Sequence, residues 1–168
     1  TNFSCRNVST CDGQLYQNPQ DAGLVANMVR EAIPPVPYLA KIGHVQDEDS
    51  AAELLDALTP FVDAFAMTNS VAALVQTPDG DLLFDGKRRG ICGDATRSAS
   101  KTQAEMFARL IAARGDKTRV IGVGGISSAD HVQEYLQSGA EAVQIATAAM
   151  VDPTIGLKIR QALATNES

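Results

Sequence analysis

The sequence predicts an α/β protein built around a parallel β-sheet. Two short apolar runs rich in β-branched residues, 120–126 and 142–147, are too short for helices and are typical of strands buried on both faces. Segments with helical periodicity alternate with these and earlier apolar runs along the chain. Such alternation favours a parallel sheet, whose ligands bind at the carboxyl ends of its strands.

Both runs end in residues suited to a phosphate group. The first ends in Gly124 and Gly125, which let backbone approach a ligand closely, and polar residues then open a helix whose free N–H groups point at the same place. The second ends in Ala146 and Thr147. The last two units of a (β/α)8 barrel hold phosphate in this way. We therefore expect a phosphate-bearing ligand, with a simple tight turn at the glycine pair as the alternative.

Composition narrows the class of partner. The 168 residues suffice for one core, and their formal net charge of −6 argues against a nucleic-acid partner. The basic cluster at 87–89 is typical of a solvated loop, and no apolar run approaches the ~20 residues of a membrane span. Cys5, Cys11 and Cys92 lack metal-ligand spacing and cannot all pair, so we expect no metal site and a reducing, cytoplasmic compartment.

The first part of the chain begins with what looks like the end of a strand at residues 1–3, so further sequence is expected upstream. Residues 8–19 form a loop long enough to be a lid. One helix runs from Gln20 to the proline pair at 34–35, and a second is capped by Asp49 or Ser50. The residues expected to face the core from these helices are Leu24, Met28, Val29, Ile33, Leu54, Leu55, Leu58 and Phe61.

Two strands in this part, residues 36–42 and 64–68, bring polar groups to their ends. The first contains Lys41, which needs a partner, because burying an unpaired ammonium is costly. The second is closed by Asn69 and Ser70. Together with residues 2–7 and the two phosphate-type strand ends, these groups predict a site at one edge of the sheet.

The later part of the chain begins with a turn sequence, Pro78-Asp79-Gly80, whose apolar neighbours predict a small hairpin inserted between residues 71 and 84. Residues 86–93 read as a glycine-containing loop. Three helices complete the chain, the last from Pro153 to Leu163. The residues expected to face the core from the first two are Ala104, Phe107, Ala108, Ile111, Val132, Tyr135 and Leu136.

These motifs together resemble the dihydroorotate dehydrogenase family, flavin enzymes built on a (β/α)8 TIM barrel. Residues 2–7, Asn-Phe-Ser-Cys-Arg-Asn, are similar to the family's Asn-x-Ser-Cys-Pro-Asn signature, and Lys41 stands where its flavin lysine stands. Asn69 and Ser70 match its substrate-binding pair, and residues 123–126 and 146–147 resemble its phosphate-binding strands. The resemblance implies that residues 1–168 are a partial FMN-binding barrel domain of about five βα units, from the fourth strand onward, without its N-terminal half.

The resemblance also implies individual roles. Cys5 would be the base that removes a proton from a substrate carbon while hydride passes to the flavin. The residues implied to bind substrate are Asn2, Asn7, Asn69 and Ser70. The residues implied to bind FMN are Asn2, Lys41, Gly90, Gly124, Gly125, Ala146 and Thr147. The alternatives are a buried structural cysteine, asparagines that cap turns, and a lysine paired with a neighbouring barrel carboxylate.

Three residues depart from the family pattern. Arg6 replaces a proline and loosens the loop that carries the base. Arg89 stands where the family has the first of two glycines. Ala146 replaces a glycine, and its extra methyl group is tolerated if φ is negative there.

The function implied by the resemblance is FMN-dependent oxidation of dihydroorotate to orotate in de novo pyrimidine biosynthesis, by an enzyme that is a homodimer when full length and has no membrane partner. A cysteine base points to the soluble class, and Asn69-Ser70 with residues 90–93 favours the fumarate-using branch. Alternatives are an oxidoreductase for another dihydropyrimidine, a sugar-phosphate barrel that performs isomerisation or aldol chemistry, and a flavin- or phosphate-binding paralogue without catalysis.

Overall fold

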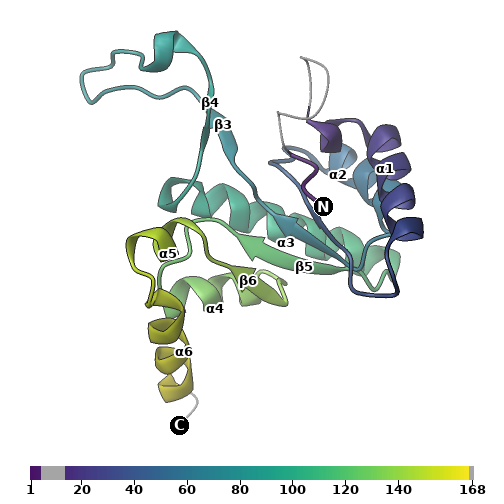
Figure 1. Cartoon of the computed structure of the whole chain (residues 1–168). Coiled ribbons are helices and arrows are strands. Elements are labelled where there is room, and N and C mark those ends of the chain that lie inside the picture. The colour runs from purple at the N-terminus through teal and green to yellow at the C-terminus, as the bar shows by residue number, and fades with distance from the viewer. Residues whose placement is uncertain (5–13, 167–168) are drawn as a thin grey trace.

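The structure is a computed structural model that describes residues 1–4 and 14–166. Its strands β1 (Leu39–Lys41), β2 (Ala64–Met67), β5 (Arg119–Val123) and β6 (Ala142–Gln144) form a parallel sheet in that order (Figure 1). Residues 1–3 extend the sheet beyond β1, because the Lys41 N–H donates to the Thr1 carbonyl and the Phe3 N–H donates to the Lys41 carbonyl, both at 2.8 Å. The predicted α/β fold with a parallel sheet is therefore confirmed.

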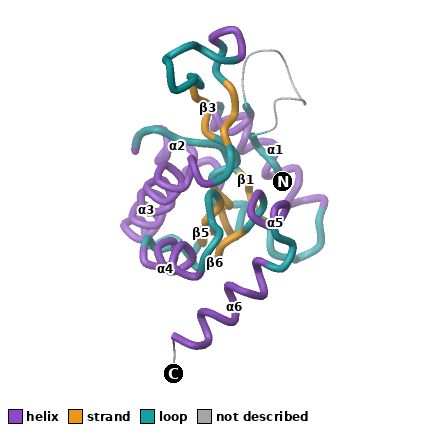
Figure 2. Tube along the Cα trace, turned by 90° about the vertical axis from the view of Figure 1, so that its left-hand side faces the viewer, coloured by secondary structure: helices purple, strands orange, loops and turns teal. Residues whose placement is uncertain are grey.

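Helices connect the strands and cover the sheet. They are α1 (Pro19–Ala32), α2 (Glu48–Leu58), α3 (Arg97–Arg114), α4 (Ala129–Gln137), α5 (Thr147–Val151) and α6 (Ile155–Asn166). Helices α2, α3 and α4 follow one another along one side of the sheet (Figure 2). All four residues of β2 are buried, as expected for a central strand, and Phe65 packs on Phe107 of α3 with ring centroids 5.7 Å apart.

Helix α2 buries Leu54, Leu55 and Leu58 as predicted, but its cap lies earlier than expected. The cap is Asp47, not Asp49 or Ser50, because its carboxylate accepts from the Ser50 N–H at 2.8 Å and from the Ser50 hydroxyl at 3.0 Å. These bonds hold the pKa of Asp47 below its usual value. The N-terminal turn of α2 is thus closed by a carboxylate that suits the positive end of a helix.

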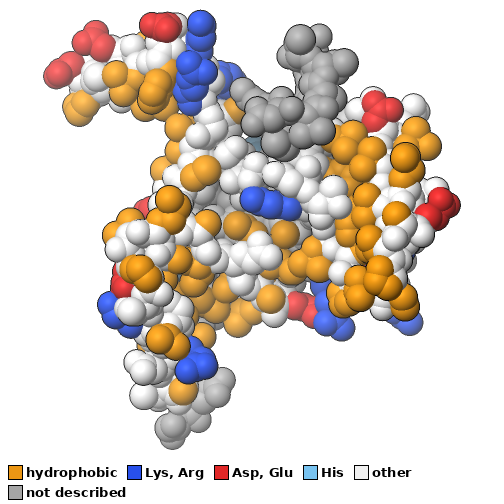
Figure 3. Space-filling model, in the orientation of Figure 1, with side chains coloured by type: hydrophobic (Ala, Val, Ile, Leu, Met, Phe, Trp, Pro, Cys, Tyr) orange, Lys and Arg blue, Asp and Glu red, His pale blue; other side chains and the backbone are white. Residues whose placement is uncertain are grey.

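Two of the four residues predicted to form the apolar face of α1, Val29 and Ile33, pack against the core as expected, but the prediction is wrong for the other two. Leu24 and Met28 are 65% and 67% exposed, whereas Ala22 and Ala26 are fully buried. The reason is close packing on α2, since a Cβ at Gly23 would lie 3.1 Å from the Ala57 carbonyl oxygen. Small side chains let the helices approach, which turns the larger ones outward, and hydrophobic atoms cover this side of the surface (Figure 3).

A two-stranded ribbon projects from the sheet between β2 and α3 (Figure 1). Strand β3 (Val71–Ala73) pairs antiparallel with β4 (Arg89–Ile91), so part of the segment predicted as a loop at 86–93 is a strand. The predicted turn is present, with the Gly80 N–H donating to the Thr77 carbonyl at 3.0 Å. A 3-10 turn at Phe84–Gly86 lies between this turn and β4, so β4 begins only at Arg89.

The C-terminal strand and helix also differ from expectation. Strand β6 lies at the edge of the sheet, and Ala142 and Gln144 are exposed where burial on both faces was predicted. Helix α5 precedes the last helix, which begins at Ile155 instead of Pro153. Within residues 1–4 and 14–166, no helix combines the length and apolarity that a membrane crossing needs.

Candidate active site

A cleft of about 470 Å³ opens at the carboxyl ends of the sheet strands. The predicted site residues that line it are Lys41, Asn69, Gly124, Gly125, Ala146 and Thr147. These residues lie at the carboxyl ends of four different strands, so the parallel sheet gathers them as expected. The prediction that Lys41 and the two phosphate-type strand ends face one cleft is confirmed.

Lys41 brings a cation to this cleft. Its side chain is half-buried, and its backbone is held between Thr1 and Phe3. Among the residues that the structure describes, no carboxylate forms an ion pair with Lys41, so none supports the alternative of a structural barrel ion pair. A half-buried ammonium of this kind favours a ligand that carries negative charge.

The loop after β5 has the shape of an anion cradle. Gly124 and Gly125 have φ of +136° and +65°, which side-chain-bearing residues rarely adopt. A Cβ at either position would also lie 2.6 Å from a neighbour, the Ser100 hydroxyl or the Arg97 Cβ. Both glycines are therefore needed for this backbone path. Exposed backbone of this kind at a strand end is suited to a phosphate group.

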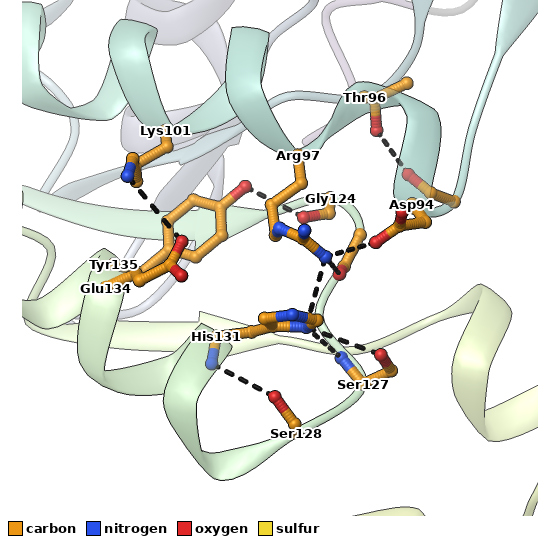
Figure 4. A network of polar contacts seen from close by, with 12 residues as sticks. Asp94, Thr96, Arg97, Lys101, Gly124, Ser127, Ser128, His131, Glu134 and Tyr135 are labelled. Carbon is orange, nitrogen blue, oxygen red and sulfur yellow. Dashed lines mark hydrogen bonds and ion pairs between the residues drawn. The ribbon is translucent and has the colours of Figure 1, made fainter.

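Polar side chains from α3 and α4 surround this cradle (Figure 4). The Tyr135 hydroxyl donates to the Gly124 carbonyl at 2.8 Å, and burial raises the pKa of Tyr135 to about 12, so it stays a donor at neutral pH. Arg97 pairs with Asp94 and donates to the Gly125 carbonyl at 3.5 Å. None of these contacts was foreseen, because Tyr135 was predicted only as a core residue.

The β6 end of the cleft tolerates its departure from the family pattern. Ala146 has φ of −122°, so the condition set for replacing glycine there is met. Thr147 lies opposite Gly93, whose Cβ would lie 3.4 Å from the threonine methyl group. The exposed Cys92 thiol also lines the cleft and donates to the Asn69 carbonyl at 3.8 Å.

A second hollow of about 460 Å³ lies beside the first, and Asn69 lines both. It also contains three other predicted site residues, Asn2, Ser70 and Gly90. Asn2 accepts from the Ser4 N–H at 3.1 Å and hydroxyl at 2.8 Å, and a Cβ at Gly90 would lie 2.9 Å from the Ser70 hydroxyl. Gly90, expected to bind flavin, thus lines this hollow and not the phosphate cleft.

Amide and hydroxyl groups dominate the second hollow. The other residues that line it are Ser4, Gln14, Tyr16, Gln17, His44, Gln46, Ala72 and Arg88. This described lining includes a single Lys or Arg, Arg88, which donates to the Ala72 carbonyl at 2.8 Å, and no Asp or Glu. Sequence reasoning missed Arg88 by assigning residues 87–89 to a solvated loop. Cys5, Arg6, Asn7 and Cys11, with most of the predicted lid, lie outside the described residues.

Gln103 of α3 fixes the backbone on which the site residues stand. Its side chain is 2% exposed and donates to the Gly43 carbonyl at 2.9 Å. It accepts from the Val45 N–H at 3.0 Å and the Thr68 hydroxyl at 3.3 Å. One buried amide thus joins the chain just after Lys41 to the chain just before Asn69.

The fold and these two hollows define an α/β protein whose parallel sheet has a glycine-containing cleft at the carboxyl ends of its strands. A sequence profile described as Dihydroorotate dehydrogenase matches residues 1–166. The chain belongs to the dihydroorotate dehydrogenase family.

Individual relatives agree with this assignment. The chain is 31% identical over 163 residues to the dihydroorotate dehydrogenase of Dictyostelium discoideum, covering 94% of this chain and 44% of the relative. It is 29% identical over 167 residues to the catalytic subunit of dihydroorotate dehydrogenase B (NAD(+)) of Geotalea uraniireducens, covering 98% and 52%. The chain therefore spans about half the length of the curated relatives it matches.

A solved structure shows the same fold. The crystal structure of DHODH from Eimeria tenella, in complex with ferulenol, superposes with a TM-score of 0.74 at 14% identity. The match covers 96% of this chain and 47% of that one. The sheet and helices described here are consistent with part of a (β/α)8 barrel.

Proposed function

We propose that this chain is the part of a dihydroorotate dehydrogenase that binds FMN phosphate and completes the substrate site for oxidising dihydroorotate to orotate, in de novo pyrimidine biosynthesis. The observation that carries the proposal is the meeting of the two hollows at Asn69. One hollow holds the glycine loop and a lysine that has no ion-pair partner among the described residues, and the other is lined by amides suited to a pyrimidine ring. Family membership supports the same reaction.

FMN fits the first hollow through residues of this chain. Gly124, Gly125 and the backbone at Ala146 and Thr147 would hold its phosphate, and Lys41 would lie against its ring, where a cation stabilises developing negative charge. When bound, FMN supplies a hydride acceptor. Lys41 thus has both a binding and an electronic role.

The reaction needs a base beside the substrate. Cys5 as thiolate would take a proton from one ring carbon while the adjacent carbon gives up a hydride, so the single bond between those carbons becomes double. Asn2, Asn7 and Asn69, with Ser70, would hold the ring by hydrogen bonds to its amide groups. Homodimer formation and a cytoplasmic location stay predictions.

Arg88 favours a substrate that carries a carboxylate. Its guanidinium is a cation in a hollow whose described lining has no acidic side chain. A guanidinium pairs well with a carboxylate, and dihydroorotate differs from neutral dihydropyrimidines in having one. This argues for dihydroorotate over the alternative of another dihydropyrimidine.

Flavin reduction in the complete protein tests the base. Under anaerobic conditions, Cys5→Ala should retain FMN but reduce it about 10² to 10⁴-fold more slowly with dihydroorotate, the usual loss for a positioned base. Cys11→Ala, in the predicted lid, is the control and should change the rate much less. An unchanged rate in Cys5→Ala would remove the mechanism, and a colourless wild type without bound flavin would remove the function.

Substrate choice tests Arg88. Arg88→Gln should raise KM for dihydroorotate by about tenfold, the order expected for a charge-assisted hydrogen bond, and leave the weaker turnover of dihydrouracil unchanged. Arg89→Gln is the matched control, because Arg89 lies over the Phe84 ring at 5.8 Å and does not line the hollow. Equal losses with both substrates would contradict carboxylate recognition by Arg88.

A further inference from the structure

The two carbonyl groups of the glycine cradle are held by side chains that do not line the cleft. The Gly124 carbonyl accepts from the Tyr135 hydroxyl of α4 at 2.8 Å. The Gly125 carbonyl accepts from Arg97 of α3 at 3.5 Å. Figure 4 shows both side chains approaching the loop from the helices. Each of the two peptide groups is therefore fixed in rotation by a separate helix.

Fixing a carbonyl also fixes the N–H of the same peptide. In a trans peptide the two groups point in opposite directions, so the N–H groups of Gly125 and Ile126 point away from Tyr135 and Arg97. Among the described residues, neither N–H has a hydrogen-bond acceptor, and both residues line the cleft. Ile126 is only 3% exposed, so an N–H left without an acceptor there is costly unless a ligand supplies one.

Arg97 is itself held in place by two further contacts. Its guanidinium pairs with Asp94 and lies 3.3 Å from Nδ1 of His131. The same nitrogen accepts from the Ser127 N–H at 3.3 Å. Because a guanidinium and a backbone N–H can only donate, Nδ1 is the acceptor and the ring proton is on Nε2. The Ser127 N–H is thus turned to the histidine, which leaves the preceding two N–H groups for the ligand.

We propose that Tyr135 and Arg97 are positioning residues that orient the Gly125 and Ile126 N–H groups onto the phosphate of FMN. They act on the phosphate alone, because neither side chain lines the space in which the flavin ring would lie. They therefore determine how strongly the protein prefers FMN over riboflavin, which has the same ring without the phosphate. The inference rests on the proposed function, since it takes the ligand to be FMN.

The test compares the dissociation constants of FMN and riboflavin, measured by quenching of flavin fluorescence on addition of the complete apoprotein. The variants are Tyr135→Phe, which keeps the ring, and Arg97→Met, with Arg97→Lys as a second arginine variant if the methionine variant fails to fold. Each should weaken FMN binding by roughly three- to tenfold, the loss expected for one hydrogen bond, and change riboflavin binding less than twofold.

Lys101→Met is the matched control. Lys101 pairs with Glu134 at 3.6 Å in the same region and has no contact with the glycine loop, so both flavins should bind it as they bind the wild type. A parallel loss of both flavins in Tyr135→Phe and the arginine variant would make these residues packing groups and overturn the inference. Unchanged FMN binding in these variants would also overturn it. A wild type that binds neither flavin would instead overturn the proposed function, and this inference with it.

Discussion

Replacing Gln103 by leucine should destabilise the protein strongly, although the two side chains have similar size. The change removes the bonds to the Gly43 carbonyl, the Val45 N–H and the Thr68 hydroxyl. Two of these partners are buried backbone groups that the leucine leaves without a bond. Each such group costs about 1–3 kcal/mol, and burial of the added apolar surface returns roughly 1 kcal/mol.

The expected loss is therefore about 1–5 kcal/mol in the free energy of unfolding, a substantial share of the usual stability of a domain. It should appear as a fall in melting temperature of roughly 3–15 °C by differential scanning calorimetry of the complete protein. Gln137→Leu at the exposed end of α4 is the control and should shift the melting temperature by about 2 °C or less. Equal shifts in the two variants would refute the assignment of Gln103 as a buried junction.

Three further outcomes are expected. Lys41→Met should slow flavin reduction by dihydroorotate at least about tenfold in stopped-flow measurements, without altering the preference for FMN over riboflavin. Gly43→Ala should lower the melting temperature, because its Cβ would lie 2.5 Å from the Tyr16 ring. The Tyr38 N–H and then Arg30 hold the pKa of Asp63 below 3.8, so its stabilisation is present above that pH and lost as pH falls through the lower folded value. Asp63→Asn should accordingly melt below the wild type at pH 7, and the gap should close under acid conditions.

The sheet can be predicted from the sequence because a buried strand shows as a short continuous apolar run. The run at 120–126 yields β5 at Arg119–Val123, and the glycine pair follows it with the positive φ that its residue type permits. In helix α1 the apolar pattern does not predict the buried face correctly. Its inward face is set by how closely α2 approaches, and apolar periodicity does not encode that distance.

The side chains that hold the loops of the site in place have no comparable pattern in the sequence. Gln103 and Arg97 are ordinary helix residues in the sequence, and their partners Gly43 and Gly125 lie 60 and 28 positions away. Periodicity indicates which helix face is buried, but not which polar atom stands opposite. Arg88 was missed for a related reason, since the sequence does not show that this residue, one position before β4, donates to the Ala72 carbonyl and lines the second hollow.

Helix α3 determines how the two halves of the site stand relative to each other. Arg97 at its start holds the glycine loop after β5, and Gln103 holds the chain after β1 and before Asn69. These residues are six positions apart, roughly 9 Å along a helix, and share no partner. Phe107, one turn of α3 after Gln103, packs on Phe65 of β2 and so fixes the helix to the sheet.

If α3 is a rigid support, each side chain acts on its own loop. The losses of unfolding free energy in Arg97→Met and Gln103→Leu should then add within about 0.5 kcal/mol in the double variant, as for independent sites. FMN preference should follow Arg97 alone, because Gln103 does not touch the glycine loop. A double variant that departs clearly from additivity would mean that the helix shifts as a body when either contact is lost, and that the two loops are coupled through its movement.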